Sequence, residues 1–253
     1  MNLWAQACAL LLVSVFGVTG VHAEAMSVGF GEHRPPYVFA GEPRGLEYEL
    51  FAAAAQAGGM HVDAHFGPNA RQRKMLDEDG LDALSSMYLP AEIDAHFSEP
   101  YVTYHDMAVA LAERQLSITS VDDLASLSVS SFKHASRLLG EQFKRMAAVN
   151  PAYREERRQL QRNLLLYAKR VDVVVGDPLI IAFFNSEVAG QVDTRQPVRW
   201  YPIFAPLHYR GVFREAEQRD RFNHGLSEIR RNGTYARIEA HYKESLKHVY
   251  PQP

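Results

Sequence analysis

The sequence predicts an α/β protein with mainly parallel sheets, and two patterns carry that prediction. Short apolar runs that suit strands alternate along the chain with longer segments of helical periodicity. Glycine, proline and asparagine stand at the junctions, where turns and helix ends favour them. The chain of 253 residues has a formal charge of -3, so it is long enough for one large domain or two small ones. That charge gives no attraction to nucleic acid or to an anionic membrane, and we expect neither as a partner.

The N-terminal segment is typical of a cleaved secretory signal. From Leu3 to Val21 the residues are almost all apolar or small, and cleavage after Ala23 or Ala25 would suit a signal peptidase. We therefore assign residues 1–23 to a signal peptide and expect a periplasmic protein with no stable membrane insertion. No lysine or arginine precedes the apolar run, so an uncleaved anchor is the alternative. Cys8 is the only cysteine, so we expect no disulfide in the mature chain.

The first half of the mature chain predicts three strands and two helices. The helix at 46–56 has Leu46, Leu50 and Phe51 on one face, and a Gly-Gly pair ends it. Two consecutive prolines force an extended loop ahead of it. The predicted order is a strand at 26–30, the loop at 35–37, the helix at 46–56, a strand at 60–66, a helix at 69–78 and a strand from 81.

The second half continues the alternation. Ser120 suits the N-cap of a short helix, and Gly233 suits the end of a long one. The predicted order is a strand at 127–132, a helix at 135–147, a long helix at 151–170, a strand at 171–175, a helix at 179–184, a helix at 215–232 and a last helix from 234. The pattern contains no internal repeat.

Short motifs follow one another along nearly the whole mature chain. They are Pro35-Pro36-Tyr37, Gly45-Leu46-Glu47-Tyr48-Glu49-Leu50, Gly80-Leu81-Asp82-Ala83, Phe97-Ser98-Glu99-Pro100-Tyr101, Ser120-Val121-Asp122-Asp123-Leu124, Val171-Asp172-Val173-Val174 with Asp177, and Phe222-Asn223 with Gly233-Thr234-Tyr235. In this order they resemble the type II periplasmic solute-binding proteins, most of all the family 3 branch that serves ABC importers of polar amino acids. Their order and spacing together make the resemblance specific.

The resemblance implies two α/β lobes joined by two crossover hinge strands, with a small-molecule ligand held in the cleft between them. Lobe one would be residues 24–108 and 206–253, and lobe two residues 109–205. Such a protein closes around its ligand, and its partner would be an ABC importer permease. We expect a monomer that needs no cofactor.

Two side chains match positions that contact the ligand in that family. Tyr37 stands where the resemblance implies an aromatic ring over the ligand, and a ring there can attract an ammonium group. The alternative is that Tyr37 packs its own loop. Asp177 matches the acidic residue that pairs with a ligand amino group. The alternative for Asp177 is a turn ahead of Pro178 that caps the helix at 179–184.

The predicted carboxylate contacts differ from the family pattern. The family usually has a Gly-Thr pair at the start of a lobe-two helix, whereas this chain has Lys133, His134, Ala135 and Ser136. Lys133 and Ser136 are our candidates there, because a helix start favours an anion.

The clamping arginine that the resemblance implies is replaced by Ala91. An ordinary α-amino acid is therefore a doubtful ligand. Arg71, with Arg73 near it, is one substitute, although a solvated helix start is the simpler explanation for both. The other possibility is a neutral or cationic ligand group met by Ser86, Tyr88 and Glu92, a further set of candidates.

The remaining conspicuous residues suit structural roles. Arg154, Arg157, Arg158 and Arg162 suit one solvated helix face. His61 and His65 lie on one strand, about 13 Å apart, too far to share a metal ion, and no metal site is expected. Two alternatives to a transport role remain. One is an enzyme on the same fold, resembling the periplasmic dehydratases, with Glu92, Asp177 and His134 as its candidate acids and bases. The other is a protein that presents its ligand to a separate sensor.

Overall fold

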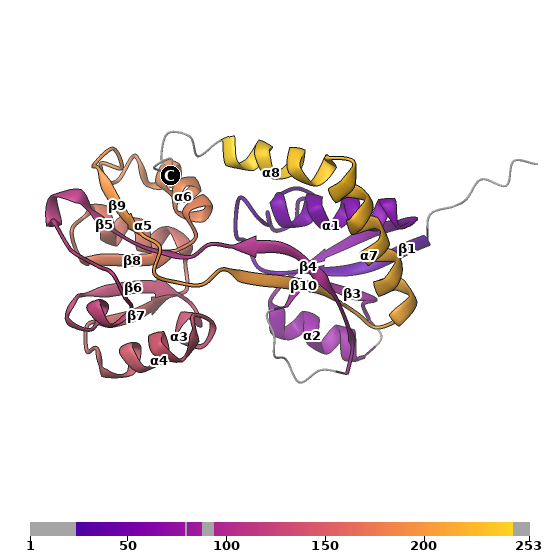
Figure 1. The fold of residues 1–253 in the computed structure, drawn as a ribbon, viewed down its shortest axis with the longest axis horizontal. Helices are drawn as coiled ribbons and strands as arrows, with labels where there is room; N and C mark the ends of the chain where they lie inside the picture. The colour runs from indigo at the N-terminus through magenta and orange to yellow at the C-terminus, as the bar shows by residue number, and fades with distance from the viewer. Residues whose placement is uncertain (1–23, 79, 88–93, 245–253) are drawn as a thin grey trace, which may run out of the picture.

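The protein has two α/β lobes connected by two strand crossovers (Figure 1). The computed structural model describes residues 24–78, 80–87 and 94–244, so the predicted signal peptide lies outside the described residues. The predicted α/β fold with two lobes is confirmed. Each sheet is mixed, however, because a crossover strand runs antiparallel to its neighbours in each one.

Lobe one is built on a five-stranded sheet of order β2-β1-β3-β10-β4. Its strands are β1 (Glu24–Phe30), β2 (Met60–Phe66), β3 (Ala83–Met87), β4 (His96–Tyr104) and β10 (Leu207–Phe213). Its helices are α1 (Leu46–Ala57), α2 (Asn69–Asp77), α7 (Ala216–Arg231) and α8 (Thr234–Glu244). Helices α1 and α7 cover one face of the sheet and α2 covers the other (Figure 1).

The core of lobe one depends on a close approach of α1 and α7. Phe51 of α1 packs on Phe213 and Phe222, with ring centroids 5.9 and 4.6 Å away. Gly225 permits this approach, because a Cβ there would lie 2.0 Å from the carbonyl oxygen of Ala54. Buried aromatic rings of this kind supply much of a lobe's stability.

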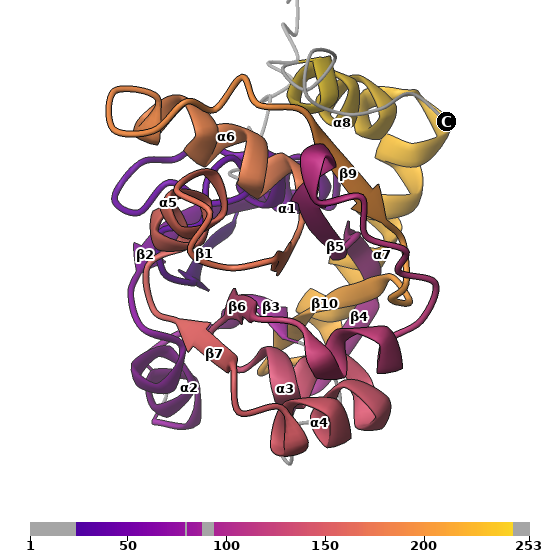
Figure 2. The ribbon, with the colours of Figure 1, turned by 90° about the vertical axis from the view of Figure 1, so that its left-hand side faces the viewer.

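Lobe two is built on a second five-stranded sheet, of order β7-β6-β8-β5-β9. Its strands are β5 (Met107–Leu111), β6 (Val129–Phe132), β7 (Tyr153–Glu156), β8 (Val173–Gly176) and β9 (Val198–Tyr201). Its helices are α3 (Ala135–Leu138), α4 (Gly140–Val149), α5 (Gln159–Tyr167) and α6 (Pro178–Val188), with 3₁₀ turns η1 (Ala112–Arg114) and η2 (Asp122–Ser126). Figure 2 shows α5 and α6 on one side of the sheet and α3 and α4 on the other.

The predicted long helix at 151–170 is wrong. Its first part is the strand β7, which pairs in parallel with β6, and only Gln159–Tyr167 is helical. The charged spacing suited a helix, but pairing with a neighbouring strand outweighed that local preference. Arg162, which we assigned to a solvated face, is 1% exposed.

The predicted helix at 135–147 is divided into α3 and α4. The second piece begins at Gly140, whose φ of 89° interrupts the helix.

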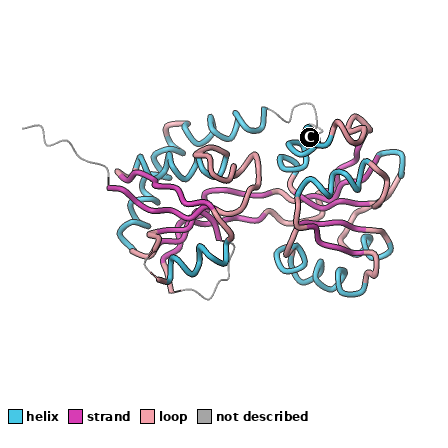
Figure 3. Tube along the Cα trace, turned by 180° about the vertical axis from the view of Figure 1, so that it is seen from behind, coloured by secondary structure: helices cyan, strands magenta, loops and turns pink. Residues whose placement is uncertain are grey.

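The two crossovers connect β4 to β5 and β9 to β10 and run side by side between the lobes (Figure 3). His105 and Asp106 are the residues between β4 and β5. None of the helices in the described part of the chain is long and apolar enough to cross a membrane.

Candidate ligand-binding site between the lobes

A tight loop after β1 brings its side chains to the face of lobe one that meets lobe two. The Tyr37 N–H donates to the Arg34 carbonyl at 3.0 Å, and the Glu47 N–H donates to the Tyr37 carbonyl at 3.0 Å, which ties the loop to the start of α1. Gly45 has a φ of 117°, and a Cβ there would lie 2.3 Å from the Tyr37 carbonyl oxygen. This glycine therefore lets the loop lie flat against α1.

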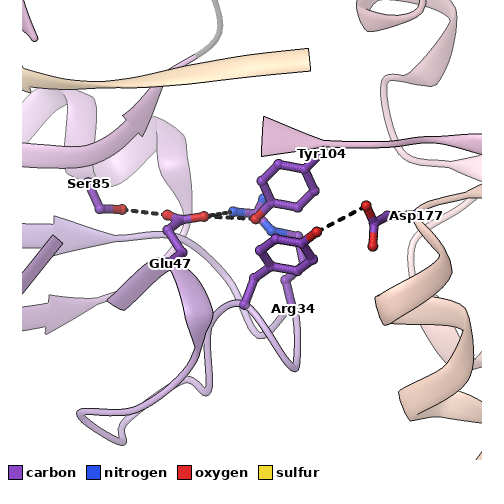
Figure 4. A network of polar contacts seen from close by, with 6 residues as sticks. Arg34, Glu47, Ser85, Tyr104 and Asp177 are labelled. Carbon is purple, nitrogen blue, oxygen red and sulfur yellow. Dashed lines mark hydrogen bonds and ion pairs between the residues drawn. The ribbon is translucent and has the colours of Figure 1, made fainter. Parts of the chain in front are cut away.

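Glu47 is the centre of a buried polar network in lobe one (Figure 4). One of its oxygens accepts from Ser85 Oγ at 2.8 Å, and the other accepts from Tyr104 OH and from Arg34 Nη2, both at 2.8 Å. The Arg34 guanidinium also lies 5.0 Å from the centre of the Tyr104 ring. A carboxylate with three donors of this quality is stable in a buried position.

Tyr37 carries this network across to lobe two. Its ring stacks on Tyr104 with centroids 4.0 Å apart, and its hydroxyl donates to Asp177 Oδ2 at 3.0 Å. The His105 N–H in the crossover donates to the same oxygen at 2.9 Å. Burial and the nearby Asp177 raise the pKa of Tyr37, so the hydroxyl keeps its proton and remains the donor.

Asp177 is also the N-cap of α6. Its Oδ1 accepts from the Leu179 N–H at 2.9 Å, and a proline follows it at the first helical position. Burial raises the pKa of Asp177, although the hydrogen bonds from His105 and Tyr37 oppose that shift. The helix-capping alternative is thus present in the structure, and contact with a ligand amino group stays a prediction.

Apolar contacts surround the Tyr37–Asp177 hydrogen bond. Tyr37 and Val38 belong to one buried cluster with Leu179, Ile180 and Phe184 of α6. Phe39 meets Phe183 edge to face at 5.7 Å. The lobes are therefore in contact in this state, with the loop after β1 seated on α6.

The start of α3 is occupied by a side chain of the protein itself. The His134 N–H donates to Glu155 at 2.6 Å, and the Ser136 N–H and Oγ donate to it at 3.0 and 2.7 Å. Tyr153 OH donates to the same carboxylate at 2.9 Å. Burial opposes ionisation of Glu155, but these hydrogen bonds outweigh it and lower its pKa. A β7 carboxylate thus lies where the resemblance implied a ligand carboxylate.

The other predicted contacts lie at different places. Lys133 is exposed, Ser86 is half-buried on β3, and Arg71 is exposed in the first turn of α2. Among the described residues, no contact joins Arg71 to Tyr37 or Asp177. Tyr88, Ala91 and Glu92 lie outside the described residues. Ligand binding by these side chains stays a prediction.

Three charged residues of this region were missed by sequence reasoning. Asp106, in the β4–β5 crossover, is 6% exposed, and burial together with Asp177 raises its pKa to about 7. Arg162 lies behind Gly176, where any Cβ would fall 2.2 Å from Arg162 Nη1. Arg34 completes the set. The sequence named Tyr37 and Asp177 as candidate contacts, whereas Glu47 appeared only within the Gly45-Leu46-Glu47 motif, as a fold marker.

The two mixed sheets, the paired crossovers and the polar groups that meet between the lobes define a two-lobed binding protein. The model of the bacterial extracellular solute-binding proteins, family 3, matches residues 26–245. The chain belongs to this family, which supports a role in binding a small-molecule ligand. Among curated proteins, none matches the sequence.

Solved structures with the same fold include proteins with different roles. A histidine kinase sensor domain with similarity to periplasmic binding proteins is 19% identical, with a TM-score of 0.68. The match covers 87% of this chain and 96% of the sensor domain. An ancestral arginine-binding protein bound to arginine is 22% identical, with a TM-score of 0.66. The match covers 87% of this chain and 99% of the arginine-binding protein. An ancestral amino acid-binding protein that is a precursor of cyclohexadienyl dehydratase is 19% identical, with a TM-score of 0.63 and coverage of 86% and 95%. At these identities the likeness concerns the fold.

Proposed function

We propose that the protein captures a small polar solute, amino-acid-like or related, in the cleft between its lobes and delivers it to an ABC importer permease. The observation that carries this proposal is the convergence of Tyr37 from lobe one and Asp177 from lobe two on one buried hydrogen bond. Groups from both lobes that meet in this way can close around a ligand and hold the closed form. The proposal includes a periplasmic, monomeric protein with a cleaved signal and no catalytic activity.

Ligand capture can be tested on protein purified without refolding. Native mass spectrometry should detect a bound small molecule, and thermal-shift screening of amino acids, amines, opines and small organic acids should find compounds that raise the melting temperature. Asp177→Asn should weaken the effect, whereas Asp193→Asn, which removes an exposed carboxylate of the same lobe, should leave it unchanged. Equal binding by wild type and Asp177→Asn would contradict this site.

Delivery to a permease is a separate step. Deletion of the gene should abolish uptake of the identified solute, and the purified liganded protein should stimulate the ATPase activity of the importer. Normal uptake in the deletion strain would overturn the transport role.

Presentation of the ligand to a separate sensor is the second candidate, favoured by the fold shared with a histidine kinase sensor domain. In that case the deletion would abolish a transcriptional response to the solute and leave its uptake intact. Turnover of a bound compound would instead support an enzyme, as would be expected of a relative of the dehydratase precursor.

A further inference from the structure

The charges buried between the lobes are unequal. Three carboxylates, those of Glu47, Asp106 and Asp177, are at most 6% exposed. Two guanidinium groups accompany them: Arg162, 1% exposed, and Arg34, whose side chain is 23% exposed. When all five groups are ionised, one negative charge is left over. A buried charge without a counterion is costly, so this excess is relieved either by a proton or by a cation.

Asp106 and Asp177 lie side by side. Met107 of β5 pairs with Gly176 of β8 in an antiparallel register. Continuing that register by one residue places Asp106 opposite Asp177, where Cβ atoms are about 4.5–5.5 Å apart. The hydrogen bond from His105 N to Asp177 Oδ2, 2.9 Å long, agrees with this closeness. Two like charges face each other at the base of the crossover.

The Asp106 carboxylate has no partner in the part of the chain that the structure describes. Within residues 24–78, 80–87 and 94–244, no group donates a hydrogen bond to its carboxylate or forms an ion pair with it. Arg162 directs Nη1 to the Val175 carbonyl at 2.5 Å and Nη2 to Gln159. Arg34 directs its guanidinium to Glu47. Asp177, by contrast, already accepts hydrogen bonds from Tyr37, His105 and Leu179, whereas both oxygens of Asp106 remain available to a donor.

Among the described residues, the helix start that the resemblance assigned to a ligand carboxylate is already occupied. Glu155 takes the N–H groups of His134 and Ser136 at the start of α3. Alanine stands at position 91, where the resemblance implies an arginine. The described site is therefore deficient in positive charge and well supplied with negative charge.

We propose that Asp106, assisted by Asp177, receives the cationic group of the solute, an ammonium or a guanidinium, and that the solute needs no α-carboxylate. Bound there, the cation takes the two oxygens of Asp106 as acceptors in charge-assisted hydrogen bonds. This inference rests on the proposed function and names the class of solute.

Proton release accompanies cation binding in this scheme. The groups around Asp106 come from three places. They are Asp177 between β8 and α6, Arg162 of α5, and Arg34 and Tyr37 of the loop after β1. Burial and Asp177 hold the pKa of Asp106 at about 7 in the ligand-free protein. A cation favours the ionised carboxylate, so affinity for the cation should rise from pH 6 to pH 8 and level off above that range.

Agmatine and L-arginine are the discriminating probes, because they share a guanidinium group and agmatine lacks the α-carboxylate. Isothermal titration calorimetry of the ligand-free mature protein at pH 8 should show agmatine binding at least as tightly as L-arginine. L-glutamate and succinate should show no binding. Asp106→Asn should weaken agmatine binding by more than tenfold and remove the increase between pH 6 and pH 8. Asp106→Glu, which keeps the charge, should retain the preference for cations, and Asp193→Asn should behave as wild type.

The outcomes separate this inference from the proposed function. Tight binding of L-glutamate or succinate, or agmatine binding by Asp106→Asn within twofold of wild type, would overturn the cation receptor and leave solute capture standing. Binding of L-arginine with no binding of agmatine would overturn the claim about the α-carboxylate. If native mass spectrometry detects no bound compound and no probe of any charge raises the melting temperature, solute capture and the cation receptor both fail. Circular dichroism of each variant checks that it is folded.

Discussion

Replacing Asp106 with asparagine should stabilise the ligand-free protein at neutral and alkaline pH. Its carboxyl has an ordinary pKa of 3.8 in the unfolded chain and a pKa of about 7 in the folded one. Between these values the folded state holds a proton that the unfolded state has lost, so the free energy of unfolding falls as pH rises through this window. Above about pH 7 the loss is complete.

The size of the effect follows from the shift. Each pKa unit corresponds to about 1.4 kcal/mol of stability. A rise of the pKa from 3.8 to about 7 therefore lowers the free energy of unfolding by at most roughly 4 kcal/mol. The asparagine amide is itself buried without a partner, which costs about 1–3 kcal/mol. We therefore expect Asp106→Asn to gain about 2 kcal/mol over wild type at pH 8, and to gain less and less as the pH falls toward 4.

Urea unfolding followed by circular dichroism at pH 4, 5, 6, 7 and 8 measures this difference, on protein refolded to remove bound solute. Asp193→Asn is the matched control, because it removes an exposed carboxylate that pairs with Arg195. Its difference from wild type should stay small at every pH. A stability difference for Asp106→Asn that is constant across the range, or that favours wild type at pH 8, would refute an unpaired buried carboxylate at this position.

Three further substitutions test the packing around the site. Glu47→Gln removes the buried partner of Arg34 and should destabilise the protein by about 3–5 kcal/mol in urea unfolding, since the guanidinium loses its counterion; a neutral result would contradict the network. Tyr37→Phe deletes the hydrogen bond between the lobes and should increase the radius of gyration of the ligand-free protein in small-angle X-ray scattering. Tyr48→Phe is the control. Equal radii for the two variants would show that this bond does not hold the lobes together. Gly225→Ala should lower stability by about 3 kcal/mol because its Cβ meets the Ala54 carbonyl, whereas Gly190→Ala has open space; equal melting temperatures would refute the close helix contact.

Most of the fold could be predicted from the sequence because local patterns coincided with the final pairing. The strand at Val173–Gly176 is a run of valines with a glycine at its end, and α6 begins at an Asp-Pro pair. Both signals are local and agree with the tertiary structure. β7 carried the opposite signal, since its charged residues suit a helix as well as an edge strand, and pairing with β6 decides between the two structures.

The site was less predictable because its charges come from distant parts of the chain. Tyr37 and Asp177 were found through the motifs that they occupy, and the structure joins them by a hydrogen bond. Asp106 gave no sequence signal: an aspartate between two strands is ordinarily a solvated turn residue, and its burial depends on the β8 end and α6. Arg162 was misplaced for the same reason, since a glycine far along the chain makes the room for it.

The Glu155 carboxylate at the start of α3 has a consequence for selectivity. Because it is tethered to β7, any free carboxylate that approaches the His134 and Ser136 N–H groups competes with a group whose effective concentration is in the millimolar range or above. The carboxylate of an amino acid at micromolar concentration would therefore not displace Glu155 from that helix terminus, whatever its side chain. Glu155 thus fills, from within the chain, the position that the resemblance assigned to a ligand carboxylate.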